Sequence, residues 1–165
     1  MHSKIVLICL FAACAAGAAF SVAAQQRDSE FVTYEWIRDG IIYEQLLDSM
    51  EQELAEIQNN WSERPAIGIY QVDLNGDQID EIIVAPGDEM YFCDWDTKVC
   101  DYYVYARVTG GLQQIADIEA VQLRVSYERT NGVRDLRAYK NINNPYLYHT
   151  YTYNRRSFAY ELRPE

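Results

Sequence analysis

Apolar and polar residues alternate through most of the chain after residue 66, and this pattern predicts a series of β-strands. Residues 121–128 give the clearest case, because valine, leucine and tyrosine alternate there with glutamine, arginine, serine and glutamate, as in a half-buried strand. Turn signals follow one another about every eight to twelve residues, which favours consecutive antiparallel pairing. The expected strands are residues 67–72, 82–84, 89–93, 101–109, 112–118, 121–128, 134–140, 146–153 and 157–162.

The segment from residue 34 to residue 59 has a different period. Its apolar side chains recur at spacings of three and four, which predicts an amphipathic helix. Gly40 interrupts the front of this pattern, so we expect a kink or a short turn there, with Asp39 as the cap. The predicted fold class is α+β, with one N-terminal amphipathic helix packed on a curved antiparallel meander of about seven to nine strands. The apolar stripe consists of Tyr43, Leu46, Leu47, Met50, Leu54 and Ile57.

Residues 1–24 have the organisation of a secretion signal, with Lys4 before an apolar run and small residues before Gln25. This run is too short and too rich in alanine to predict a membrane span. We therefore expect a signal peptide at 1–24, a flexible leader at 25–33 and a single α+β domain at 34–165. A second processing route stays open, because the residues ending at Cys14 resemble a lipobox, and cleavage there would leave a lipid anchor on Cys14. Either route predicts a periplasmic or secreted protein.

Two cysteines, Cys93 and Cys100, remain after removal of the predicted signal. In an oxidising compartment an even pair is most simply one disulfide, here closing a short hairpin loop. A zinc site would need three or four nitrogen or sulfur ligands, and the mature chain offers only these thiols and His149.

Negative charge is concentrated in the first part of the mature chain. Residues 25–101 carry 19 acidic and 4 basic side chains, whereas residues 102–165 carry 6 acidic and 9 basic ones. Such acidity argues against a nucleic-acid partner, whose phosphates would be repelled. It favours cations or a basic protein, although acidity also simply keeps a secreted protein in solution.

One turn of the sequence has the composition of an ion site. The run DLNGDQIDE, residues 73–81, places oxygen-bearing side chains at its first, third, fifth and ninth positions. Hard cations such as calcium take six to eight oxygen ligands from carboxylates, amides and backbone carbonyls. The alternative is a hairpin turn in which these side chains only bond their own backbone.

This run, which reads DxNGDxxxE, resembles the calcium loop of FG-GAP and integrin-type propeller repeats, whose consensus is DxNGDGxxD. A similar loop also occurs in small secreted bacterial proteins of unknown role. The resemblance is local and covers residues 72–84. It implies calcium as a cofactor, with Asp73, Asn75, Asp77 and Glu81 as side-chain ligands and Ile79 contributing its carbonyl. One departure is Gln78, which replaces the usual glycine, so the backbone must avoid positive φ or strain into it.

Eleven of the fourteen tyrosines lie from Tyr91 onward, on both faces of their predicted strands. Tyrosine suits strands and is also enriched at contact surfaces. We expect a partner-binding surface there, with arginines 107, 124, 134 and 137 between the rings; ordinary cross-strand pairing on a wet sheet face is the alternative. The candidate partner-binding residues are Tyr103, Tyr105, Tyr146, Tyr148 and Tyr151.

No nucleophile in the sequence has an evident base. His149 is the one imidazole outside the predicted signal, and no GxSxG motif accompanies it. We therefore expect a non-enzymatic binding protein, in its specific form an inhibitor or immunity-type binder of a basic extracytoplasmic protein such as a cell-wall hydrolase. Two alternatives are a hydrolase of cell wall or polysaccharide that acts through carboxylates and a structural subunit of an extracytoplasmic assembly.

Overall fold

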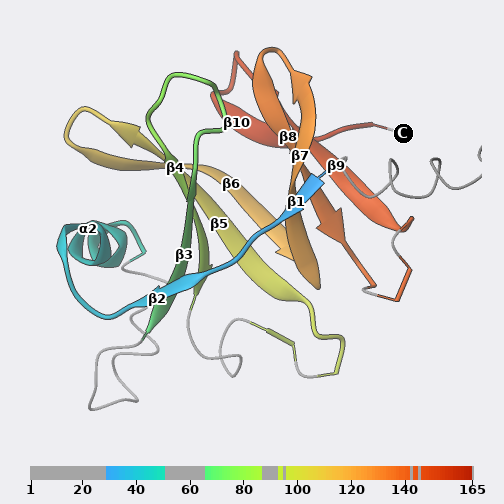
Figure 1. Ribbon diagram of the computed structural model, residues 1–165, viewed down its shortest axis with the longest axis horizontal. Helices are drawn as coiled ribbons and strands as arrows, with labels where there is room; N and C mark the ends of the chain where they lie inside the picture. The colour runs from blue at the N-terminus through green and yellow to red at the C-terminus, as the bar shows by residue number, and fades with distance from the viewer. Residues whose placement is uncertain are drawn as a thin grey trace, which may run out of the picture.

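The computed structural model describes residues 29–50, 66–86, 93–94, 96–141, 143–144 and 146–164. Within these residues the chain forms ten strands and one helix, and the strands make two antiparallel sheets of five (Figure 1). Sheet A has the order β1 (Ser29–Phe31), β7 (Gln122–Thr130), β8 (Val133–Tyr139), β9 (Tyr148–Asn154) and β10 (Ala159–Leu162). Sheet B has the order β2 (Glu35–Ile37), β3 (Ile67–Val72), β4 (Glu81–Pro86), β5 (Cys100–Val108) and β6 (Gly111–Ala120).

The α+β prediction is therefore wrong, because the described protein is mainly β and its strands divide between two sheets. The physical reason lies in continuous apolar runs such as residues 82–84 and 102–105. A meander covered on one face only would alternate apolar and polar residues, whereas these runs are buried on both faces. One face of sheet B needs a helix and the other needs a second sheet.

Between the two sheets lies the larger core. From sheet B it contains Ile83, Val104 and Ile118, and from sheet A it contains Leu123 and Leu136. All five side chains are almost completely buried. The chain passes from one sheet to the other at a single residue, Val121, between the end of β6 and the start of β7, so the two meanders face each other across this core.

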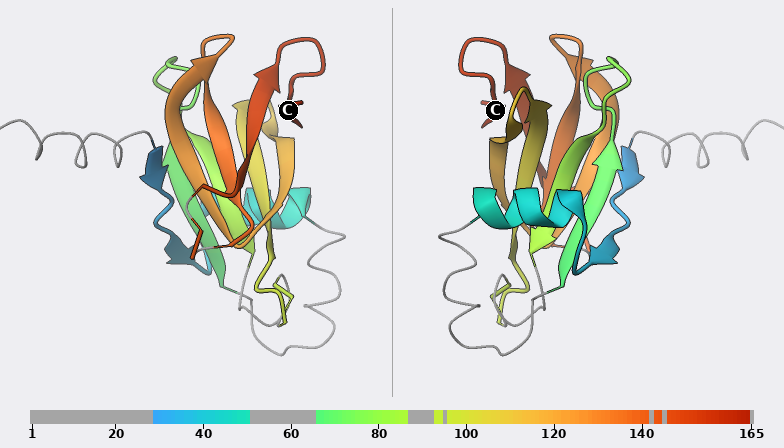
Figure 2. Two further views of the ribbon diagram at one scale, coloured as in Figure 1. Left: turned by 90° about the vertical axis from the view of Figure 1, so that its right-hand side faces the viewer. Right: turned by 90° about the vertical axis from the view of Figure 1, so that its left-hand side faces the viewer.

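The second core lies on the outer side of sheet B. Tyr43, Leu46 and Met50 at α2 (Ile41–Ser49) are fully buried against side chains that include Ile82 and Tyr105. Figure 2 shows α2 lying across this side of the sheet. The helix begins after Gly40, at a φ of 97°, without a side-chain cap, so the expected Asp39 cap is not formed. Glu35–Ile37 is a strand, contrary to the predicted start of the helix at residue 34.

A single extended segment joins the edges of both sheets (Figure 1). β1 pairs with β7 in sheet A, and β2 pairs with β3 in sheet B. The flexible leader expected at residues 25–33 therefore gives way to a paired strand at Ser29. The predicted signal peptide, Cys14 and the helical continuation to residue 59 lie outside the described residues. No helix in the described part of the chain is long and apolar enough to cross a membrane.

Candidate functional site

The acidic loop, residues 73–80, connects β3 to β4 and lies at one end of the two sheets. The sequence predicted this hairpin, and the strands that flank it are confirmed. Pairing of Val72 with Glu81 closes its base. Because Gly76 and Gln78 both have positive φ, at 86° and 69°, the chain reverses within a few residues. Gln78 therefore adopts the left-handed conformation that a glycine would adopt more easily.

The side chains of the acidic loop accept hydrogen bonds from its own backbone. Asp73 accepts from the N–H groups of Gly76 and Gln78 at 2.6 and 3.0 Å. The side-chain oxygen of Asn75 accepts from Asp77 N–H, and Asp77 in turn accepts from Ile79 N–H, both at 2.8 Å. These donors, led by Gly76 N–H, hold the pKa of Asp73 below its usual value. This is the alternative of a self-bonded turn that the sequence left open.

Glu81 is the buried member of the predicted ligand set, with 6% of its surface exposed. One of its oxygens accepts from Leu74 N–H at 2.8 Å and the other from the Asn75 amide nitrogen at 2.9 Å. Burial raises the pKa of this carboxyl, and the charges of Asp77 and Asp73 raise it further. Glu81 therefore serves as the acceptor that ties the start of the loop to its end.

Leu74 and Arg129 connect the acidic loop to sheet A. The Leu74 side chain is fully buried in the core between the sheets. Its carbonyl accepts from Arg134 N–H at 2.8 Å and from the Arg129 guanidinium at 3.2 Å. The positive charge of Arg129 also contributes to the lowered pKa of Asp73. Sequence reasoning missed Arg129, because it lies 55 residues along the chain from Leu74 and no local pattern marks it.

The arrangement does not fit the calcium shell that the resemblance implies. The Asn75 amide is oriented by Asp77 N–H, so its nitrogen, which cannot bind a cation, faces Asp77 at 3.1 Å and Glu81 at 2.9 Å. Among the described residues no three acidic, histidine or cysteine side chains converge on one point. The five predicted ligands, Asp73, Asn75, Asp77, Ile79 and Glu81, are thus brought into one loop without forming a shell of oxygens.

The predicted disulfide between Cys93 and Cys100 is confirmed. The two residues also form an isolated antiparallel bridge, in which Cys100 is the first residue of β5. Asp94 accepts from the N–H groups of Asp96 and Thr97 at 2.9 and 2.7 Å. These hydrogen bonds, of which the one from Thr97 N–H has the largest effect, keep the pKa of Asp94 below its usual value. The turn between the two cysteines is therefore stabilised by its own backbone.

The predicted tyrosine surface is not assembled. Tyr103 and Tyr105 are only 7% and 1% exposed, because they face α2 rather than solvent, so these two assignments are wrong. Tyr151 is half-buried against the core between the sheets. Tyr146 is 85% exposed in the turn before β9, and Tyr148 packs on Tyr139 with ring centroids 5.2 Å apart.

Three of the arginines expected between rings do stack on aromatic side chains. The Arg124 guanidinium lies 3.9 Å from the ring centre of Phe31 and 4.5 Å from that of Tyr139. Arg134 and Arg137 lie over Tyr127 and Tyr148. Arg107 instead donates to Asp80 O and to Gln71. Arg124, Arg134 and Arg137 therefore make cation–π contacts with rings of their own sheet.

Carboxylates gather on the side of sheet B that carries α2. The strand register places Asp101 opposite Glu119, and Asp117 opposite Tyr103, which packs towards α2. Burial and the charges of Asp117 and Glu119 raise the pKa of Asp101. Like charges facing each other across a strand pair destabilise a sheet. We call the following residues the acidic face: Glu35, Glu44, Asp48, Asp101, Asp117 and Glu119.

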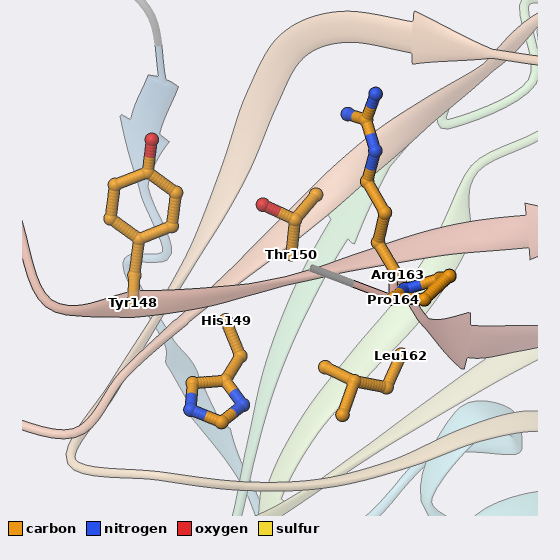
Figure 3. Close-up of a pocket in the computed structure, with 6 residues that line it drawn as sticks. All are labelled: Tyr148, His149, Thr150, Leu162, Arg163 and Pro164. Carbon is orange, nitrogen blue, oxygen red and sulfur yellow. The ribbon is translucent and has the colours of Figure 1, made fainter.

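A shallow pocket of about 390 Å³ lies beside β9 and the C-terminal segment. Tyr148, Thr150 and Arg163 point to one side of the strand, whereas His149 points to the other (Figure 3). None of the described residues that line this pocket carries a carboxylate. The histidine cannot act as a base on the Thr150 hydroxyl from the opposite side of the strand, and these lining residues do not supply the pair of acids that a hydrolase needs.

A scan against protein-family models finds no match to this chain, and searches of curated proteins and of solved structures find no significant match.

Proposed function

We propose that this is an exported, non-enzymatic binding protein that captures a basic extracytoplasmic protein on the acidic face. The specific partner class that fits is a basic cell-wall hydrolase, which the protein would inhibit. The observation that carries the proposal is the register of Asp101, Asp117 and Glu119, three carboxylates on adjacent strands of one exposed side. Their repulsion costs stability in the free protein, and a cationic partner would relieve it.

The distribution of charge over the two sheets also supports binding of a basic partner at the acidic face. Glu44 and Asp48 are exposed on α2, which covers the same side of sheet B as the carboxylates of β5 and β6. In sheet A, in contrast, basic and acidic side chains pair, Arg134 with Glu30 and Arg137 with Glu128. The acidic face thus brings six carboxylates together on the helix side of sheet B, and attraction there accelerates encounter with a basic protein.

The experiment measures binding of the mature chain to a lysozyme, as a basic cell-wall hydrolase, by surface plasmon resonance at low and high salt. Cytochrome c, equally basic but not a hydrolase, serves as the probe for charge alone. We expect salt-sensitive binding to the lysozyme that the triple variant Asp101→Asn, Asp117→Asn, Glu119→Gln weakens at least tenfold.

A control variant makes the same type of change at two positions of the other sheet. Glu128→Gln with Glu161→Gln removes carboxylates from sheet A and should leave the affinity within about twofold. Equal loss of affinity in both variants would mean that only net charge matters. Binding of cytochrome c as tightly as the lysozyme would remove the hydrolase from the proposal.

A further inference from the structure

The resemblance to a calcium loop and the geometry of the acidic loop disagree, and the disagreement concerns what balances the negative charge. In a calcium loop the carboxylates are held together by the ion between them. Here the carboxylates of Asp73 and Asp77 instead accept hydrogen bonds from backbone N–H groups. The Asn75 amide nitrogen bridges Asp77 and Glu81. The protein's own donors therefore fill the inner side of the loop.

A positive charge is also present, and it comes from sheet A. The Arg129 Nη1 atom donates to Leu74 O at 3.2 Å and to Gly132 O at 2.8 Å. A Cβ added at Gly76 would lie 3.7 Å from the same nitrogen. The guanidinium thus lies against the backbone of the acidic loop, close enough for its positive charge to act on Asp73. It also joins the loop to the β7–β8 hairpin.

The neighbouring contacts make this junction a clamp between the sheets. Arg134 N–H, on β8, donates to the same Leu74 carbonyl at 2.8 Å. The Leu74 side chain is inserted into the core that both sheets share. One carbonyl of the acidic loop, which joins β3 to β4 in sheet B, therefore receives two donors from sheet A.

We propose that Arg129 takes the place of a calcium ion at the acidic loop, and that this loop is a metal-independent clamp between sheets A and B. The loop keeps its shape through backbone donors, the arginine balances its charge, and Leu74 anchors it. Calcium then contributes nothing to the stability of the folded protein, because no oxygen shell is available to bind it.

The test compares the thermal unfolding of the mature wild-type chain in millimolar calcium and in excess chelator, with calcium titration by calorimetry. We expect the two unfolding midpoints to agree within about one degree and no heat of binding. A calcium-dependent rise that Asp77→Asn abolishes would overturn the proposal. This comparison requires no variant that might fail to fold.

The second arm tests the arginine. Arg129→Gln is compared with Arg155→Gln, which also removes one positive charge. The Arg155 variant loses a similar hydrogen bond, from its guanidinium to Asn131 O in the β7–β8 hairpin, but leaves the acidic loop unchanged. We expect Arg129→Gln to lower the unfolding midpoint more than Arg155→Gln, and Arg129→Lys to recover part of the loss. Equal midpoints for the two glutamine variants would refute the clamp.

Discussion

At the scale of single residues, the described structure holds its charges in two distinct ways. The carboxylates of Asp73 and Asp94 accept hydrogen bonds from backbone N–H groups, and these bonds lower their pKa values. Asp101 faces other carboxylates instead, and its pKa is raised. The first arrangement stabilises the fold at neutral pH, whereas the second opposes it. The sequence located the acidic loop that contains Asp73, but only the register of β5 on β6 decided that Asp101 faces Glu119.

The variant Asp101→Asn is expected to be more stable than the wild type at neutral pH, by about 0.2–1 kcal/mol at low salt. The pKa of Asp101 in the folded protein lies above its ordinary value of 3.8. The destabilisation by charge repulsion is therefore complete at a pH above the folded pKa and decreases as the pH falls below it. Urea unfolding near pH 7 and near pH 3 measures the difference. The exposed Asp96→Asn is the control, and an advantage that persists in acid would contradict this account.

At the scale of elements, most strands follow from the sequence and the helix follows in part. Alternation, turn residues and the cysteine pair located β3 to β10 within a few residues of their observed bounds. The short strands β1 and β2 were missed because three residues carry too little periodicity, and each is fixed by a partner far along the chain. Local pattern predicts local pairing but does not predict the addition of an edge strand.

The cysteine hairpin offers a direct measurement at this scale. Replacing both Cys93 and Cys100 by serine should lower the free energy of unfolding by about 2 to 3 kcal/mol, because the unfolded chain regains the freedom that the short closed loop removes. Urea unfolding of the wild type with and without reductant provides the control, since reduction should reproduce the loss. A wild type indifferent to reductant would show that the hairpin is held by other contacts.

At the scale of the whole molecule, the segment that carries β1 and β2 connects the two sheets. β1 extends sheet A and β2 extends sheet B. Glu30 in this segment also pairs with Arg134 of β8, at 2.6 Å. Together with the acidic loop and the corner at Val121, it fixes how one meander faces the other.

A chain that begins at Val32 should therefore be less stable than a chain that begins at Gln25. Loss of the β1 pairing and of the Glu30–Arg134 ion pair is expected to lower the free energy of unfolding by about 1–3 kcal/mol. Differential scanning calorimetry of both chains measures this, and Glu30→Gln in the longer chain isolates the ion pair. Identical unfolding of the two chains would remove the connecting role of β1.

The sequence by itself determined the positions of the long strands, the acidic hairpin, the disulfide pair and the uneven charge, because each depends on residues that are close along the chain. Tertiary structure decided the division into two sheets, the burial of Tyr103 and Tyr105 under α2, and the approach of Arg129 to Leu74. These features join residues tens of positions apart, so they arise only when both faces of sheet B are covered. Arg129 reaches the acidic loop because the β7–β8 hairpin packs against that loop.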